Sequence, residues 1–251
     1  MQKILSAEQI EAFYHDQFVE DQVRHFVLLF GANSNLKNVT DMGGGCGFFA
    51  KRLKNQAAYK VKVVDMDVAS VQACRDSGID ATQGDALHPE ISGHENIVSF
   101  NLILHHLVAG SDGGTLALQT AALAVWRPHV QSVFVNEYIY ESYLRNFSGW
   151  LIFRITKSPV LSWFGRVVSK VVPSLKANTF GVGVRFRASQ EWRRVFESAG
   201  YIVKSCVVGE NEHVSLPRRL LLIKHIRRDS FMLEPRVDKR VLPASSPCLS
   251  S

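Results

Sequence analysis

Residues 39–47 constrain the fold of this chain more than any other segment, because an apolar run there ends in an acid and then in closely spaced glycines. The acid is Asp41, and glycines occupy positions 43, 44, 45 and 47. A turn with so little side-chain bulk lets the backbone curl tightly and approach a ligand closely. Residues 48–53 have a helical pattern, and the N–H groups at a helix start can face a ligand over the turn. The segment therefore predicts a strand, a turn and a helix that bind a nucleotide cofactor.

The glycines alone do not identify the cofactor, because Gly45, Gly47 and Ala50 also fit the dinucleotide pattern G-x-G-x-x-G/A. Asp41 separates the two cases, since a carboxylate there would repel a pyrophosphate but suits a cofactor that carries an ammonium and a sulfonium. The run resembles the first motif of the class I S-adenosylmethionine-dependent methyltransferases, an acid followed by G-x-G-x-G. This resemblance implies that Asp41, Gly43, Gly45 and Gly47 bind S-adenosylmethionine.

Further polar residues follow predicted strands where that family has them. Asp65 closes a β-branched run 24 residues after Asp41, and a carboxylate there can accept hydrogen bonds from both ribose hydroxyls. A third predicted strand, 79–86, contains the pair Gly84-Asp85, and the resemblance implies that Asp85 contacts the adenine amino group. A fourth, 97–104, contains Asn101, which the resemblance places at the methionine end. The predicted cofactor site therefore adds Asp65, Met66, Asp85, Ala86 and Asn101.

A narrower likeness concerns the residues after the fourth and fifth strands. His105 follows the fourth, and Glu137 ends the fifth, predicted over 132–137. The chain is similar here to bacterial and plant O-methyltransferases, in which a His is the general base and a Glu orients it. The resemblance implies these roles for His105 and Glu137, and a His with its ordinary pKa near ~6.5 suits the task.

This chain also departs from those O-methyltransferases. Their usual Asp-Trp after the His is His106-Leu107 here, and a second orienting Glu is replaced within residues 184–187. The separate amino-terminal dimerisation domain is missing. The alternative is that His105 is a packing residue without a role as base.

Strands alternate with helices over residues 36–140, which predicts one α/β domain with a doubly wound, mostly parallel sheet. A helix over 189–201 and two antiparallel strands, 202–208 and 220–224, would complete the seven-stranded, Rossmann-like methyltransferase fold. We expect residues 1–35 to form a helical segment over the cofactor site and 36–230 the core. A helical cap is predicted at about 138–187, and a disordered tail over 231–251.

The predicted cap is apolar with interspersed cations. Arg154, Lys157, Arg166 and Lys170 interrupt residues 150–172, so the segment is too charged to span a membrane, which takes ~20 apolar residues. A cap over an apolar substrate is the favoured interpretation. The alternatives are peripheral contact of 150–172 with a membrane or an acidic partner, and an ordinary helical pair or dimer face.

Composition limits the other classes of function. The four cysteines, Cys46, Cys74, Cys206 and Cys248, form no C-x-x-C pair, so neither a disulfide scaffold nor a metal site is predicted. The amino terminus is polar by residue 6, which argues against a signal peptide and for a cytoplasmic protein. The net charge of +6 would suit nucleic acid, but much of the surplus lies in the cap and in residues 218–240.

The sequence thus predicts an S-adenosylmethionine-dependent methyltransferase that acts on an apolar or aromatic small molecule, at oxygen. Methylation of RNA, of a peptide or of a carrier-bound substrate remains an alternative. An NAD(P)-binding oxidoreductase is disfavoured by Asp41 and by the lack of a Tyr-x-x-x-Lys pair after the fifth strand. A cofactor-binding partner protein without catalysis is the alternative outside the enzymes.

Overall fold

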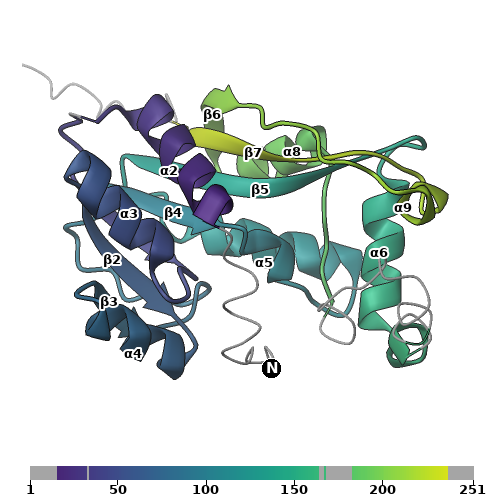
Figure 1. The fold of residues 1–251 in the computed structure, drawn as a ribbon, viewed down its shortest axis with the longest axis horizontal. Helices are drawn as coiled ribbons and strands as arrows, with labels where there is room; N and C mark the ends of the chain where they lie inside the picture. The colour runs from purple at the N-terminus through teal and green to yellow at the C-terminus, as the bar shows by residue number, and fades with distance from the viewer. Residues whose placement is uncertain (1–15, 33, 164–166, 168–182, 237–251) are drawn as a thin grey trace, which may run out of the picture.

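The computed structural model describes residues 16–32, 34–163, 167 and 183–236, and they form one seven-stranded sheet with helices on both faces (Figure 1). The strand order is β3-β2-β1-β4-β5-β7-β6, which confirms the predicted doubly wound fold. The strands are β1 Asn38–Met42, β2 Lys60–Asp65, β3 Asp80–Gln83, β4 Ile97–Asn101, β5 Ser132–Ser142, β6 Tyr201–Val207 and β7 Ile223–Pro235.

Strand direction separates this sheet from a dinucleotide-binding one. The first five strands pair in parallel, with β1 between β2 and β4. Strand β7 is antiparallel to both of its neighbours, β5 and β6. The dinucleotide-binding fold has the strand order 3-2-1-4-5-6 and no such insertion. The topology therefore argues against the oxidoreductase alternative.

Helices α2 Asp16–Phe30, α3 Phe48–Ala57 and α4 Val68–Asp76 cover one face of the sheet. Their core is aromatic, with the ring of Phe26 centred 5.0 Å from Phe134 of β5 and 5.1 Å from Tyr59. Helices α5 Asp112–Ala124 and α8 Ser189–Ser198 cover the other face, where Trp192 and Phe196 are fully buried. Helices α6 Phe147–Lys157 and α9 Leu216–Leu220 lie together at one end of the molecule (Figure 1).

The carboxyl-terminal strands are longer than predicted. Strand β5 continues to Ser142, so residues 138–142, assigned to the cap, belong to the sheet. Strand β7 begins at Ile223 and runs to Pro235, so the predicted strand 220–224 is largely wrong and the tail cannot begin at 231. The basic run hid this strand from the sequence pattern. Its charges are paired in the structure, since Arg227 contacts Asp229 at 2.9 Å and Arg228 contacts Asp21 at 3.5 Å.

Smaller differences concern the earlier strands and both ends. Strand β4 stops at Asn101, three residues early, and a short 3-10 helix, Leu104–His106, carries the two histidines. Strand β3 is also shorter than predicted. Residues 1–15, part of the predicted cap (164–166 and 168–182) and the tail over 237–251 lie outside the described residues. Cover of the cofactor site by the amino-terminal segment thus stays a prediction. Within the described residues, no helix is long and apolar enough to cross a membrane.

Candidate active site

The glycine-rich turn joins β1 to α3 at the carboxyl ends of the parallel strands. Gly43 has a φ of +67° and Gly47 a φ of +75°, a region that favours glycine. Both glycines are also closely packed by side chains. A Cβ on Gly43 would lie 2.0 Å from Cδ1 of Ile103, and one on Gly47 would lie 2.8 Å from Sγ of Cys74. Ile103 thus brings the segment after β4 directly against the turn.

Asp41 lies beneath this turn as a fully buried carboxylate. Its Oδ1 accepts hydrogen bonds of 3.0 Å from the Ser99 hydroxyl and from Nδ2 of Asn101. Its Oδ2 has no hydrogen-bond partner among the described residues, and the same holds for Oδ1 of Asn101. Burial and, to a smaller extent, the charge of Asp65 raise the pKa of Asp41 to about 7, although the two hydrogen bonds act to lower it. Both orphaned atoms are acceptors, which suits a ligand that brings donors or positive charge.

Ser99 is a site residue that the sequence analysis missed. It occupies a polar position within the apolar strand β4, two residues before Asn101. Residues two apart on a strand face the same way, so this alternation was a signal that could have found it.

Asp65, at the end of β2, braces the glycine turn. Its Oδ2 accepts a hydrogen bond of 2.9 Å from the N–H of Gly45, and its Oδ1 accepts one of 2.9 Å from the N–H of Asp67. The side chain is half-buried, and each carboxylate oxygen can accept a further hydrogen bond. The structure therefore brings Asp41, Gly45 and Asp65 to one edge of the sheet, as predicted.

The other predicted cofactor residues differ in their surroundings. Asp85 is partly exposed and accepts hydrogen bonds from the N–H of Leu87 and from His88. Met66 is exposed, whereas Ala86 is buried in the core beneath α5 and α8. These three side chains are placed by the loops that follow β2 and β3.

His105, in the 3-10 helix after β4, forms a buried pair with Glu137, which lies within β5. Nδ1 of His105 lies 2.7 Å from Oε2 of Glu137, and both side chains are almost completely buried. Oε1 of Glu137 accepts the N–H groups of Leu104 at 2.7 Å and His105 at 3.3 Å, and Oε2 accepts that of Tyr138 at 3.2 Å. The carboxylate is thereby fixed by three backbone donors.

These contacts assign the proton on the imidazole. The backbone partners of Glu137 are all donors, which an ionised carboxylate accepts. Nδ1 of His105 then donates to Glu137, and Nε2 keeps its lone pair. A histidine held in this tautomer can take a proton at Nε2.

Aromatic rings surround His105, and two of them come from β5. Phe186 stacks on the imidazole with ring centres 4.9 Å apart, and Tyr140 stacks on Phe186 at 4.2 Å. Tyr138 approaches His105 edge-on at 5.9 Å. All three rings are half-buried. Phe186 belongs to residues 184–187, the segment in which the sequence lacks the second orienting Glu.

Two neighbours complete the surroundings of the pair. Desolvation lowers the pKa of His106 well below its ordinary value, and the adjacent His105 lowers it further. Its ring lies 4.2 Å from that of His105. Arg185 donates its backbone N–H to the His105 carbonyl at 2.9 Å, which fixes the segment that contains Phe186 against the histidine.

The similarity to known proteins lies in the fold. No protein-family model matches this chain. No curated protein matches it either. Among solved structures, the MccD protein superposes with a TM-score of 0.59 at 9% identity, over 86% of this chain and 97% of that one. An S-adenosylmethionine-dependent methyltransferase from Clostridium acetobutylicum ATCC 824 gives a TM-score of 0.54 at 9% identity, over 91% and 95%. The fold is that of class I methyltransferases.

A third structure is larger than this protein. The mitomycin 7-O-methyltransferase MmcR gives a TM-score of 0.54 at 10% identity over 87% of this chain. The chain spans 53% of the length of that enzyme.

Proposed function

We propose that this protein is an S-adenosylmethionine-dependent methyltransferase that methylates a hydroxyl group of an apolar or aromatic small molecule. The observation that carries the proposal is the buried pair of His105 and Glu137, 2.7 Å apart, beside the glycine-rich turn. Ile103, two residues before His105, packs against Gly43 of that turn. A base and a cofactor-binding turn are therefore neighbours at one edge of the sheet.

The residues at this edge fit a cationic cofactor. Asp41 and Asn101 each have a buried oxygen without a donor among the described residues, and Asp65 retains acceptor capacity for ribose hydroxyls. In this proposal the glycine turn and Asp41 hold the methionine end together with Asn101, and Asp65 holds the ribose with Met66 beside it. Asp85 and Ala86 would lie at the adenine. When bound, the cofactor supplies an electrophilic methyl group on a sulfonium.

The protein would then orient the acceptor and take its proton. Nε2 of His105 would accept the proton of the acceptor hydroxyl, and Glu137 would stabilise the imidazolium that results. A positioned general base contributes about 10²–10⁴-fold to such a rate. The rings of Tyr138, Tyr140 and Phe186 form an apolar wall beside His105, which favours an aromatic or apolar acceptor. The name of MmcR, an O-methyltransferase with this fold, supports the choice of oxygen.

Titration calorimetry with S-adenosylmethionine, S-adenosylhomocysteine and NADP tests the cofactor. We expect both adenosyl ligands to bind with micromolar dissociation constants and NADP to give no heat. Binding of NADP alone would assign the glycine turn to a dehydrogenase and overturn the proposal.

Transfer of a labelled methyl group from S-adenosylmethionine tests the acceptor. Phenols, hydroxynaphthoates, catechols and aliphatic alcohols are compared with the matching amines and with RNA. We expect label on a phenolic or other apolar hydroxyl compound and its loss in the His105→Ala variant. Label on RNA or on amines alone would contradict methylation at oxygen.

A further inference from the structure

Large apolar side chains are exposed where α6 and α9 meet at one end of the molecule (Figure 1). Leu144 is 62% exposed, Leu216 77% and Leu220 83%. We call the following set the end surface: Tyr143, Leu144, Phe147, Trp150, Leu216 and Leu220. Exposed apolar residues are ordinary when they are scattered singly, but a group on adjoining segments marks an interaction site.

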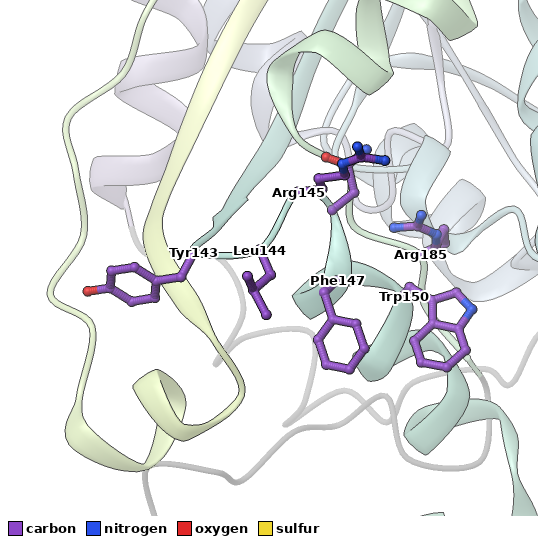
Figure 2. A pocket seen from close by; sticks show the side chains of 7 residues that line it. Tyr143, Leu144, Arg145, Phe147, Trp150 and Arg185 are labelled. Carbon is purple, nitrogen blue, oxygen red and sulfur yellow. The ribbon is translucent and has the colours of Figure 1, made fainter.

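Two distant parts of the sequence build the end surface. The turn between β5 and α6 supplies Tyr143 and Leu144, α6 supplies Phe147 and Trp150, and α9 supplies the two leucines. The N–H of Tyr143 donates a hydrogen bond of 3.0 Å to the carbonyl of Leu222, which fixes the two segments against each other. In Figure 2, Phe147 and Trp150 project side by side near Arg145, and their ring centres are 5.5 Å apart. The turn encloses a shallow hollow of about 620 Å³.

The charge around this surface has one sign. The segments that build it, residues 142–163 and 213–226, contain six Lys and Arg residues and no Asp or Glu. Arg145 is exposed, and the guanidinium of Arg154 lies 5.8 Å from the centre of the Trp150 ring. Neither arginine takes part in an ion pair with another described residue.

We propose that the end surface docks the protein on an anionic lipid bilayer, with its aromatic and leucine side chains in the interface and its arginines at the headgroups. Trp and Tyr favour the membrane–water interface, and exposed apolar side chains between cations are what peripheral binding needs. The hollow in the bound face is lined in part by Arg185, which precedes Phe186 and donates its N–H to the His105 carbonyl, so an acceptor dissolved in the lipid would reach the proposed site from that side. This last step rests on the proposed function, whereas lipid binding does not.

Charge decides between a bilayer and a second copy of this chain. In a two-fold dimer the same patch meets itself, so the cations of both copies would face each other without a carboxylate between them. An anionic membrane neutralises them instead, because Lys and Arg near such a surface each contribute about 1 kcal/mol, or roughly fivefold in binding.

Sedimentation of the full chain with lipid vesicles tests the proposal. Vesicles of phosphatidylcholine alone are compared with vesicles that also contain phosphatidylglycerol, at low and at high salt. We expect binding to the anionic vesicles, weak or no binding to the neutral ones, and weaker binding at high salt.

Two double variants test the surface, each with a matched control. Phe147→Ser with Trp150→Ser should lower vesicle binding by at least about tenfold, since each large apolar side chain contributes ~1.5–3 kcal/mol on burial. Arg145→Gln with Arg154→Gln should lower it by roughly 20-fold at low salt. The controls are Leu28→Ser, at an exposed leucine of α2, and Lys60→Gln, at the start of β2. Unchanged binding of S-adenosylhomocysteine shows that each variant is folded.

Three outcomes would overturn lipid docking: no vesicle binding, equal binding to both kinds of vesicle, or loss of binding in the controls as large as in the variants. A concentration-dependent dimer that Phe147→Ser with Trp150→Ser dissociates, without vesicle binding, would assign the surface to a second copy. Failure of the cofactor titration with intact vesicle binding would overturn the proposed function and leave the docking surface in place.

Discussion

Strands β1 and β5 each carry a fully buried carboxylate near the same edge of the sheet, and the two carboxylates differ in their hydrogen-bond partners. Glu137 on β5 accepts three backbone N–H groups and pairs with His105, so both of its oxygens are satisfied. Asp41 on β1 accepts two side-chain donors on one oxygen, and its other oxygen has no partner among the described residues.

The difference suits Glu137 to positioning a neighbouring side chain and Asp41 to binding a ligand that carries positive charge. A carboxylate saturated by fixed donors holds its neighbour in one orientation, which suits the role of Glu137 toward His105. A buried carboxylate with a spare acceptor is costly in the free protein, and burial raises the pKa of Asp41 to about 7. A positive ligand nearby would stabilise its ionised form. The β5 end would thus serve the acceptor and the β1 end the cofactor.

Glu137→Gln tests the β5 side of this comparison and should have the largest effect on the methyl-transfer rate. If the amide oxygen keeps the two backbone donors, its NH₂ group faces Nδ1 of His105 and forces the proton to Nε2, where a base needs a lone pair. We expect the methyl-transfer rate to fall about 10²–10⁴-fold, the usual share of a general base. Single-turnover rates measure this once an acceptor is identified.

Its control is Glu141→Gln, which changes a partly exposed carboxylate on the same strand. The affinity for S-adenosylmethionine should change less than twofold in both variants. Equal rates for Glu137→Gln and the wild type would make His105 a packing residue.

Asp41→Asn tests the β1 side through stability. The pKa of Asp41 is raised from 3.8 to about 7, so the folded state holds a proton that the unfolded state releases between these values. The carboxylate therefore costs stability as the pH rises from about 4 to 7. The variant should gain on the order of 2–3 kcal/mol over the wild type between pH 5 and pH 8, measured by urea unfolding.

The same Asp41→Asn variant should bind S-adenosylmethionine more weakly than the wild type at pH 8. Asp76→Asn, on the exposed end of α4, is the matched control for stability. A variant that is no more stable than the wild type at pH 8 would show that the buried carboxylate is not strained.

Asp65→Ala sharpens the assignment of the cofactor to the β1 side. The substitution removes the proposed acceptor for the ribose and the hydrogen bond that Asp65 accepts from the Gly45 N–H. We expect the free energy of S-adenosylmethionine binding to weaken by about 1.5–3 kcal/mol, the scale of hydrogen bonds to a charged group. Calorimetry provides the measurement, with Asp80→Ala at the start of β3 as the control. An unchanged dissociation constant would remove Asp65 from the site.

Phe186→Leu should have the smallest effect. It removes the ring that stacks on His105 and keeps an apolar side chain of similar length. Aromatic pairs contribute about 0.5–1.5 kcal/mol, so we expect the transfer rate to fall about 2–10-fold with unchanged cofactor affinity. Phe186→Tyr, which keeps an aromatic ring, should have a transfer rate close to that of the wild type. A fall in cofactor affinity instead would place Phe186 on the cofactor side.

Sequence patterns predicted the parallel half of this molecule well. The run that ends at Asp41 became β1, the run that ends at Asp65 became β2, and the turn between β1 and α3 holds the glycines. Each of these signals is local: an apolar run, a strand-ending acid, and glycines at positions where φ is positive. Such features can be predicted from the sequence because they depend only on residues that are close together along the chain.

The antiparallel half was predicted less well. Strand β7 contains Arg227, Arg228 and Asp229, and read as sequence these residues indicate an exposed basic segment. Arg227 pairs with Asp229 of the same strand, but their other partners lie on α2 and on β5, so only the packed molecule shows that the charges are compensated. The end of β5 was missed for a related reason, since its last residues are held by pairing with β7.

By itself, the sequence determined the fold class and the positions of Asp41 and Asp65 near the ends of β1 and β2, because periodicity and turn chemistry act over a few residues. It also indicated His105 after the fourth strand and Glu137 on the fifth. The tertiary structure alone decided that Nδ1 of His105 faces Glu137 and that Phe186, 81 residues later, stacks on the same ring. It also decided that α6 and α9 share one surface. Contacts between distant segments depend on how the helices and strands pack, and no local pattern records them.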